Sequence, residues 1–294
     1  MTGEDYEFPA SEPPGRHPII ERAIVMSDIP GSVDVDIADS VVAGSGLGTS
    51  ASVMVALVAA LSAAVGDTLD AGELAAMAHS YETITGKQSG IQDHAAAAWG
   101  GISRFDVHYP MVRRELIVPP PAASAQLAAR LHTVYLGSPH VSSEMHDEVI
   151  ARLDSGHGED ELERLRGSAR SATDALRLGD LGAYGMALHE SHKAIESLHT
   201  GLVGDEARRL VELAREHGAR GWKVNGAGGQ GGSMAVLGPE DRDADLAFRA
   251  AIAQHAGWRL LSAAIGAPGV TTQVSMVDGA DLVAMRSQLP DEVE

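Results

Sequence analysis

The feature that most constrains this chain is a glycine-rich segment followed at once by a long apolar helix. Residues 32–37 (SVDVDI) alternate apolar and acidic side chains, which predicts a strand with one buried face. Residues 49–65 are rich in alanine, valine and leucine, which predicts a helix that is buried nearly all round. A loop between such elements can bind phosphate, because glycines let backbone N–H groups turn inward and the helix start adds positive potential. The loop residues are Gly44, Ser45, Gly46, Leu47, Gly48, Thr49, Ser50 and Ala51.

The residues alone leave two interpretations of this loop open. Thr49 and Ser50 place hydroxyl groups at the helix start, where they can bond a phosphate oxygen or ligate Mg²⁺. The same residues are equally suited to a glycine-rich turn with a Ser/Thr N-cap. The loop is not of the Walker type, because no Gly-Lys-Ser/Thr follows it.

Composition limits the classes of protein to which the chain can belong. Its 294 residues suit one large domain or two modest ones. A net charge of -19 argues against sequence-independent binding to nucleic acid or to an anionic membrane. The absence of cysteine excludes disulfides and thiolate sites and fits a cytoplasmic location. The polar, proline-rich start predicts no signal peptide, and the most apolar stretch (53–65) is too short to span a bilayer.

The rest of the chain alternates between predicted helices and strands. Asp70 with Glu73 predicts a capping box that opens a helix ending near Thr85. Strands are expected at 130–136, 222–224, 233–237 and 269–277, and helices at 19–26, 142–217 and 247–253. A second glycine loop, 226–231, satisfies G-x-G-x-x-G, but a strand rather than a helix is expected after it. We therefore reject a dinucleotide-binding fold.

Three motifs together resemble the GHMP kinase family of small-molecule kinases. GSGLGTSAS is similar to the family's phosphate loop, although Val41 and Val42 stand where many members carry proline. YETITGKQSGIQDHAAAAWGGISRF and VNGAGGQGGSMAVL follow in the family's order and spacing. The resemblance covers roughly residues 17–280. LHTVYLGSPHVSSEMHDEVI places it closest to the heptose-phosphate and fucose kinase branch.

The resemblance implies an α+β fold with two domains. We expect a disordered tail at 1–17, a shortened ATP-binding domain at 18–128 and a ferredoxin-like domain at 129–294. Family members usually carry a longer stretch before the phosphate loop, whereas 43 residues precede Gly44 here. The implied function is transfer of the ATP γ-phosphate to a hydroxyl of a sugar or sugar phosphate. The alternatives are a weakly active ligand-binding or regulatory homologue, or one half of a split kinase. The expected partners are the small substrate and either a homodimer or a second chain supplying strands, with no nucleic acid or membrane.

The resemblance also assigns site residues. It implies that Asp93 is the catalytic carboxylate, which accepts the proton of the substrate hydroxyl or holds that hydroxyl in line. It implies that Glu82 and Ser50 ligate Mg²⁺, and that residues 44–51 with Gly228 and Gly229 bind ATP. From the residues alone, Glu82 is better interpreted as a solvated, accessible acid, and Asp93 can be interpreted as a helix cap. Lys87 reads as a solvated lysine or a phosphate-neutralising one, and His94, beside Asp93, is a candidate for substrate contact.

Overall fold

A computed structural model describes residues 6–38, 41–42, 44–84, 86, 89–139, 143–226, 228–276 and 283–288. The chain divides into two compact units. The first unit combines Met1–Val41, Gly48–Glu115 and Gly266–Glu294. The second combines Val42–Leu47 with Leu116–Ile265. The sequence did not indicate that the C-terminal segment would group with the N-terminal one.

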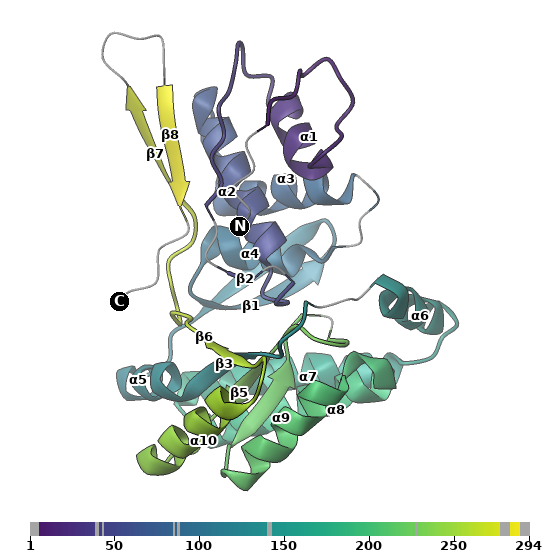
Figure 1. Cartoon of the computed structure of the whole chain (residues 1–294), viewed down its shortest axis with the longest axis vertical. Coiled ribbons are helices and arrows are strands. Elements are labelled where there is room, and N and C mark those ends of the chain that lie inside the picture. The colour runs from purple at the N-terminus through teal and green to yellow at the C-terminus, as the bar shows by residue number, and fades with distance from the viewer. Residues whose placement is uncertain are drawn as a thin grey trace. The chain divides into compact units, whose positions relative to one another are not determined.

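The first unit is built around the apolar helix α2 (Figure 1). Helices α3 and α4 and the hairpin of β7 and β8 pack on α2, while β1 and β2 form a separate two-stranded hairpin. Met54, Val55 and Val58 of α2 are buried in its core. The elements are α1 (Pro18–Met26), α2 (Thr49–Ala64), α3 (Ala71–Thr83), α4 (Ile91–Trp99), β1 (Ile102–His108), β2 (Met111–Ile117), β7 (Thr271–Met276) and β8 (Val283–Gln288).

Helix α3 begins as the sequence predicts. The Asp70 carboxylate accepts hydrogen bonds from the backbone N–H groups of Gly72 and Glu73, and the Glu73 side chain accepts from the backbone of Asp70. Both halves of the capping box are therefore present. The helix ends at Thr83, slightly before the predicted position.

The strand predicted at 32–37 is wrong. These residues have neither helical nor strand structure. A strand needs a neighbour that satisfies its backbone N–H and C=O groups. No described strand pairs with this segment, so its alternating pattern is not sufficient to make it a strand.

The second unit has a ferredoxin-like arrangement, as the family resemblance implies. Its four antiparallel strands lie in the order β4-β5-β3-β6, and helices connect β3 to β4 and β5 to β6. Trp222, Met234 and Phe248 lie in its core. The elements are α5 (Pro121–Arg130), β3 (Leu131–Tyr135), α6 (Ser143–Asp154), α7 (Glu159–Leu178), α8 (Leu181–Leu198), a 3-10 turn (Thr200–Leu202), α9 (Asp205–Glu216), β4 (Gly221–Val224), β5 (Ser233–Leu237), α10 (Arg242–Gln254) and β6 (Arg259–Leu261).

The second glycine loop joins β4 to β5, as predicted. A strand follows it, so the dinucleotide-binding interpretation is excluded by topology as well as by sequence.

The N-terminal residues 6–17 have no helix or strand, yet they contact a buried acid. Glu21, only 1% exposed, accepts hydrogen bonds from the Tyr6 hydroxyl and from the backbone N–H groups of Gly15, Arg16 and His17. Burial raises the pKa of Glu21, but these hydrogen bonds outweigh it and leave the pKa below its usual value.

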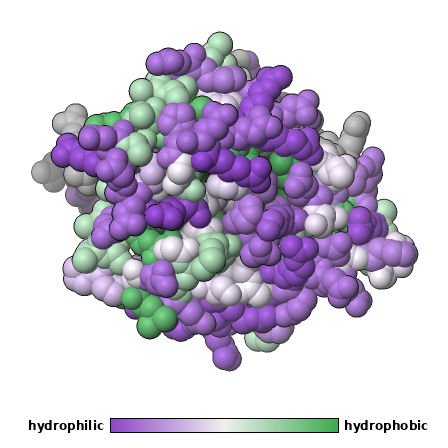
Figure 2. Space-filling view, turned by 90° about the horizontal axis from the view of Figure 1, so that it is seen from below, coloured by the Kyte–Doolittle hydropathy of each residue, from purple (hydrophilic) through white to green (hydrophobic). Residues whose placement is uncertain are grey.

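One face of the surface can be described by its hydropathy. The face shown in Figure 2 is mostly hydrophilic, with apolar residues interspersed. Of the helices in the described ranges, none combines the length and apolar character needed to cross a bilayer.

Candidate active site

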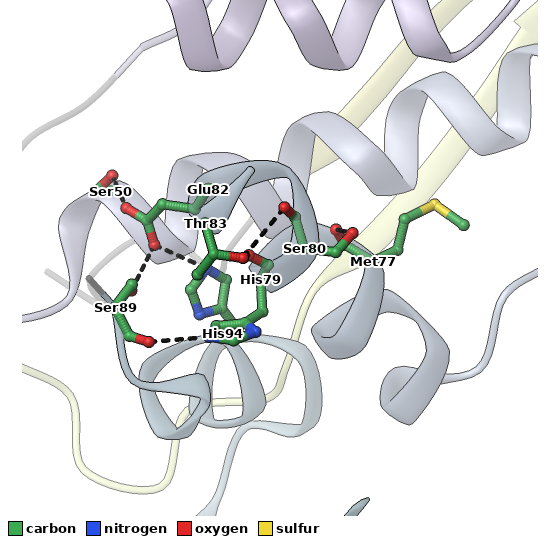
Figure 3. Close-up of polar contacts among 8 residues, drawn as sticks. All are labelled: Ser50, Met77, His79, Ser80, Glu82, Thr83, Ser89 and His94. Atoms are coloured by element: carbon green, nitrogen blue, oxygen red, sulfur yellow. Dashed lines mark hydrogen bonds and ion pairs between the residues drawn. The ribbon is translucent and has the colours of Figure 1, made fainter. Parts of the chain in front are cut away.

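The centre of the candidate site is the carboxylate of Glu82, in the last turn of α3 (Figure 3). The Ser50 hydroxyl donates to Glu82 Oε1 at 2.5 Å, and the Ser89 hydroxyl donates to Oε2 at 2.7 Å. His94 Nε2 lies 3.0 Å from Oε2, within ion-pair range, although the ring is not aligned for a hydrogen bond. The first turns of α2 and α4 and the segment before α4 therefore converge on one carboxylate.

Burial distinguishes Glu82 from an ordinary surface acid. The residue is 1% exposed, so the prediction that it is solvated and accessible is wrong. A carboxylate this deeply buried is costly unless hydrogen bonds or a positive charge compensate it. It also lies at the negative end of the α3 dipole, which adds to the cost. A protein that keeps such a group at this position has to stabilise it with the surrounding donors.

His94 belongs to this cluster rather than to a substrate surface. The side chain is fully buried, so the prediction that it contacts substrate is wrong. Its ring lies edge-on to that of His79, which in turn contacts the backbone oxygen of Ser89 at 2.9 Å. Sequence analysis missed Ser89. Spacing gave no signal for it, because its contact with Glu82 depends on how the chain turns between α3 and α4.

The donor set fits Mg²⁺ better than a transition metal. Glu82 and Ser50 offer a carboxylate and a hydroxyl oxygen, the hard ligands that Mg²⁺ prefers. Across the described ranges, no three His, Asp or Glu residues are arranged to hold a metal ion. An ion bound here would complete its shell with water and phosphate oxygens, as Mg²⁺ in phosphoryl-transfer enzymes does.

The start of α2 is suited to an anion. The N-cap is Gly48 in the left-handed conformation (φ 74°), and no side chain caps the helix. The Thr49 hydroxyl is buried and has no hydrogen-bond partner. The N-cap interpretation of Thr49 and Ser50 is therefore excluded. The first N–H groups of a helix have no acceptor within the helix, and a phosphate is an acceptor that suits them.

Asp93 lies against this helix start. It stands in the first turn of α4, is exposed, and does not cap that helix, whose N-cap is Gly90. A Cβ built on Gly48 would lie 3.1 Å from Cβ and Cγ of Asp93. Glycine at 48 thus permits both the positive φ and the close approach of the carboxylate. Asp93 is therefore not the N-cap residue of α4, and its catalytic role stays a prediction.

The beginning of the first glycine loop packs within the second unit. The Ser233 hydroxyl donates to the backbone oxygen of Ser45 at 2.7 Å, and Asn225 Nδ2 donates to the Ser233 hydroxyl at 2.9 Å. A Cβ atom on Gly46 would lie 3.3 Å from the backbone oxygen of Asn225. The Ser45 hydroxyl is buried without a hydrogen-bond partner. Sequence analysis did not single out Asn225 or Ser233.

The second glycine loop packs against the chain after α8. A Cβ on Gly228 would lie 2.1 Å from the Leu202 oxygen, and the Gly229 N–H donates to that oxygen at 2.7 Å. Close backbone packing therefore accounts for these glycines, and their predicted contact with ATP stays a prediction. Lys87 lies outside the described residues.

Comparison with known proteins agrees with this geometry. The model of the GHMP kinases N terminal domain matches residues 19–101, and that of the GHMP kinases C terminal domain matches residues 172–256. The first match ends at residue 101 and the second begins at residue 172. Neither match reaches residue 128, so the predicted domain boundary there stays a prediction.

Two individual relatives are kinases of different small molecules. The mevalonate kinase of Thermococcus onnurineus is 31% identical over 71% of this chain and 60% of the relative. The D-glycero-alpha-D-manno-heptose 7-phosphate kinase of Campylobacter jejuni is 24% identical over 64% of this chain and 56% of the relative. The chain thus spans about 60% of the length of these relatives.

Solved structures show the same fold. The Methanococcus jannaschii mevalonate kinase superposes with a TM-score of 0.64 at 18% identity, covering 86% of this chain and 77% of that one. Together with the two family models, this likeness identifies the architecture of both units. The chain belongs to the GHMP kinase family.

Proposed function

We propose that the chain is an ATP- and Mg²⁺-dependent kinase that transfers the γ-phosphate to a hydroxyl of a sugar or sugar phosphate. The observation that carries this proposal is the Ser50–Glu82 pair, at 2.5 Å, beside the uncapped start of α2. A buried carboxylate, a hydroxyl and the N–H groups of a helix start are suited to a metal-bound triphosphate.

Phosphoryl transfer depends mainly on positioning and charge neutralisation. In this proposal residues 44–51 bind the phosphates through backbone N–H groups and hydroxyls. Glu82 and Ser50 hold Mg²⁺, which neutralises developing charge on the phosphates when it is bound. Asp93 accepts the proton of the acceptor hydroxyl or holds that hydroxyl in line. Ser89 and His94 fix the Glu82 carboxylate in place.

The acceptor class rests on the relatives. Both named groups phosphorylate an alcohol, one on mevalonate and the other on a heptose phosphate. The motif resemblance favours the sugar branch. The 31% identity to a mevalonate kinase makes mevalonate the second candidate.

A second chain is also part of the proposal. Among the described strands, β1 and β2 pair only with each other, and Tyr109 and Met111 at their turn are 68% and 71% exposed. Unpaired strand edges are surfaces to which another strand can add. We propose that a second copy or a partner chain covers them. Light scattering of the purified chain over a concentration series tests self-association.

An acceptor panel tests the proposed reaction. The chain is incubated with Mg·ATP and single sugars, heptose phosphates or mevalonate, and the phosphorylated product is identified by mass spectrometry. We expect one acceptor class to gain one phosphate and to release one ADP. If no acceptor is phosphorylated while Mg·ATP still binds, the ligand-binding alternative replaces the kinase.

A further inference from the structure

A pocket of about 270 Å³ lies in the second unit, along the facing sides of α8 and α9. None of the residues that line it belongs to the candidate active site. Its lining comes from two helical stripes, which are His189, His192, Lys193 and Glu196 on α8 and Arg208, Val211, Glu212 and Arg215 on α9.

The spacing of these residues explains why they share one opening. Positions three, four and seven apart lie on the same face of a helix. Residues 189, 192 and 193 therefore line one wall, and residues 208, 211 and 215 line the other. The arrangement follows from helix geometry and does not depend on the conformation of a loop.

Two histidines in the pocket have unsatisfied nitrogens. Nδ1 of His189 and Nδ1 of His192 are buried and have no hydrogen-bond partner. His192 is only 5% exposed. Burial lowers the pKa of both histidines, to about 4 for His192, so both are neutral at pH 7. Unpaired buried polar groups are rare in folded proteins and point to a missing partner.

The pocket offers several cationic donors to an anion. Its lining carries three cations, Lys193, Arg208 and Arg215, and two carboxylates, Glu196 and Glu212. Two further acids, Glu190 and Asp205, pair with Lys193 and Arg208.

The cations are available to a ligand. The Arg215 guanidinium lies 5.2 Å from the centre of the Trp222 ring, and no described carboxylate lies within ion-pair distance of it. Arg208 contacts Asp205 at 3.4 Å and Glu196 at 3.6 Å, and Lys193 contacts Glu190 at 3.2 Å, but the side chains of these pairs are 43–78% exposed. Exposed pairs of this kind are weak and exchange readily for a better acceptor.

We propose that this pocket binds the phosphate or diphosphate group of a small metabolite. Two guanidinium groups and an ammonium group around one opening suit an anion with several acceptor oxygens. The neutral imidazoles can add N–H donors from the buried side. A metal ion is a poorer occupant, because the described His, Asp and Glu residues form no metal-binding group of three.

Calorimetric titration with inorganic pyrophosphate, without Mg²⁺, tests this proposal. We expect binding by the wild-type chain and a loss of affinity of about 10- to 100-fold in Arg208→Gln and in Arg215→Gln. Arg209→Gln is the matched control, because Arg209 follows Arg208 on α9, pairs with Glu206 and does not line the pocket. Its affinity should equal that of the wild type.

Further measurements distinguish binding in this pocket from binding at other sites, and pyrophosphate from other anions. Arg215→Gln also removes the contact of Arg215 with the Trp222 ring, which can affect the structure of the pocket. His192→Gln is therefore a further pocket variant that leaves this contact in place. We expect it to weaken pyrophosphate binding as well. Pyrophosphate binding that all three pocket variants leave unchanged would place the anion elsewhere, for instance at the first glycine loop, and would overturn the proposal. Absence of binding would overturn it as well. Tighter binding of citrate than of pyrophosphate in this pocket would contradict the proposal that the ligand carries a phosphate or diphosphate group.

Discussion

The Ser50 hydroxyl lies 2.5 Å from Oε1 of Glu82, which joins the start of α2 to the end of α3. The two residues are 32 positions apart in the chain. Their contact turns a glycine-rich helix start and an unfavourably placed acid into one polar centre. The proposed metal chemistry depends on this contact, because neither residue alone provides the pair of oxygen ligands.

Replacing Glu82 with glutamine should weaken the binding of Mg²⁺. The amide keeps the size of the side chain, but it removes the charge and replaces one of the two oxygens that accept from Ser50 and Ser89 with an NH2 group. We expect the Mg²⁺ concentration for half-maximal activity to rise about 10-fold or more. Activity measured over a Mg²⁺ series at saturating ATP gives this value.

Glu21→Gln is the matched control for that variant. Glu21 is equally buried, at 1% exposure, and lies in the same unit, but it contacts the N-terminal segment rather than the candidate site. Its loss should lower thermal stability and leave the Mg²⁺ dependence unchanged. If both variants shift the Mg²⁺ dependence alike, Glu82 has a structural role only.

Replacing Gly48 with alanine should impair the site more than the fold. The new Cβ would lie 3.1 Å from Asp93, and φ at this position is 74°. Gly66→Ala is the control, because Gly66 has φ 81° and its Cβ would meet nothing within 4 Å. Both changes should cost about 1–2 kcal/mol of unfolding free energy through the left-handed backbone. Only Gly48→Ala should also lower turnover. Chemical denaturation and steady-state kinetics measure the two effects, and equal turnover in the two variants would contradict the role given to Gly48.

The buried His192 predicts a loss of stability in mild acid. Burial is the main cause of its lowered pKa of about 4, with smaller contributions from His189, Arg215 and Lys223, while Glu196 opposes them. The unfolded chain takes up a proton below about pH 6.5, whereas the folded chain does so only near pH 4. Stability is therefore lost as the pH falls between these values. The contribution of this residue between pH 7 and pH 5 is about 2 kcal/mol.

Urea unfolding at both pH values checks this prediction. His192→Gln should reduce the difference in unfolding free energy between pH 7 and pH 5. His157→Gln, which removes an exposed histidine, should leave the difference as in the wild type. An unchanged difference in His192→Gln would show that other groups control the acid sensitivity.

Local signals predicted those parts of the fold that depend on neighbouring residues. The Asp70–Glu73 capping box, the apolar helix after the first glycine loop and the strands around the second loop all formed as expected. Each is encoded within about 20 residues of sequence. The rejection of a dinucleotide fold succeeded for the same reason, because the residues after Gly231 already had the character of a strand.

Features that depend on distant partners could not be predicted. The segment 32–37 has a strand pattern but no described partner strand. The surroundings of Glu82 come from Ser50 on α2, His94 on α4 and Ser89, which no helical spacing brings together. The grouping of β7 and β8 with the first unit likewise arises from packing on α2. The family resemblance named Glu82 and Asp93, but it did not indicate the surroundings of either residue.

The most direct test of the kinase mechanism is the turnover number of Asp93→Asn with Mg·ATP and the acceptor found in the panel. Asparagine keeps the shape but removes the charge and the proton acceptor. We predict a fall in turnover of about 10²–10⁴-fold, with little change in ATP affinity. Asp174→Asn, which changes an acid that is 73% exposed on α7, should behave as the wild type. Full turnover by Asp93→Asn would contradict the mechanism.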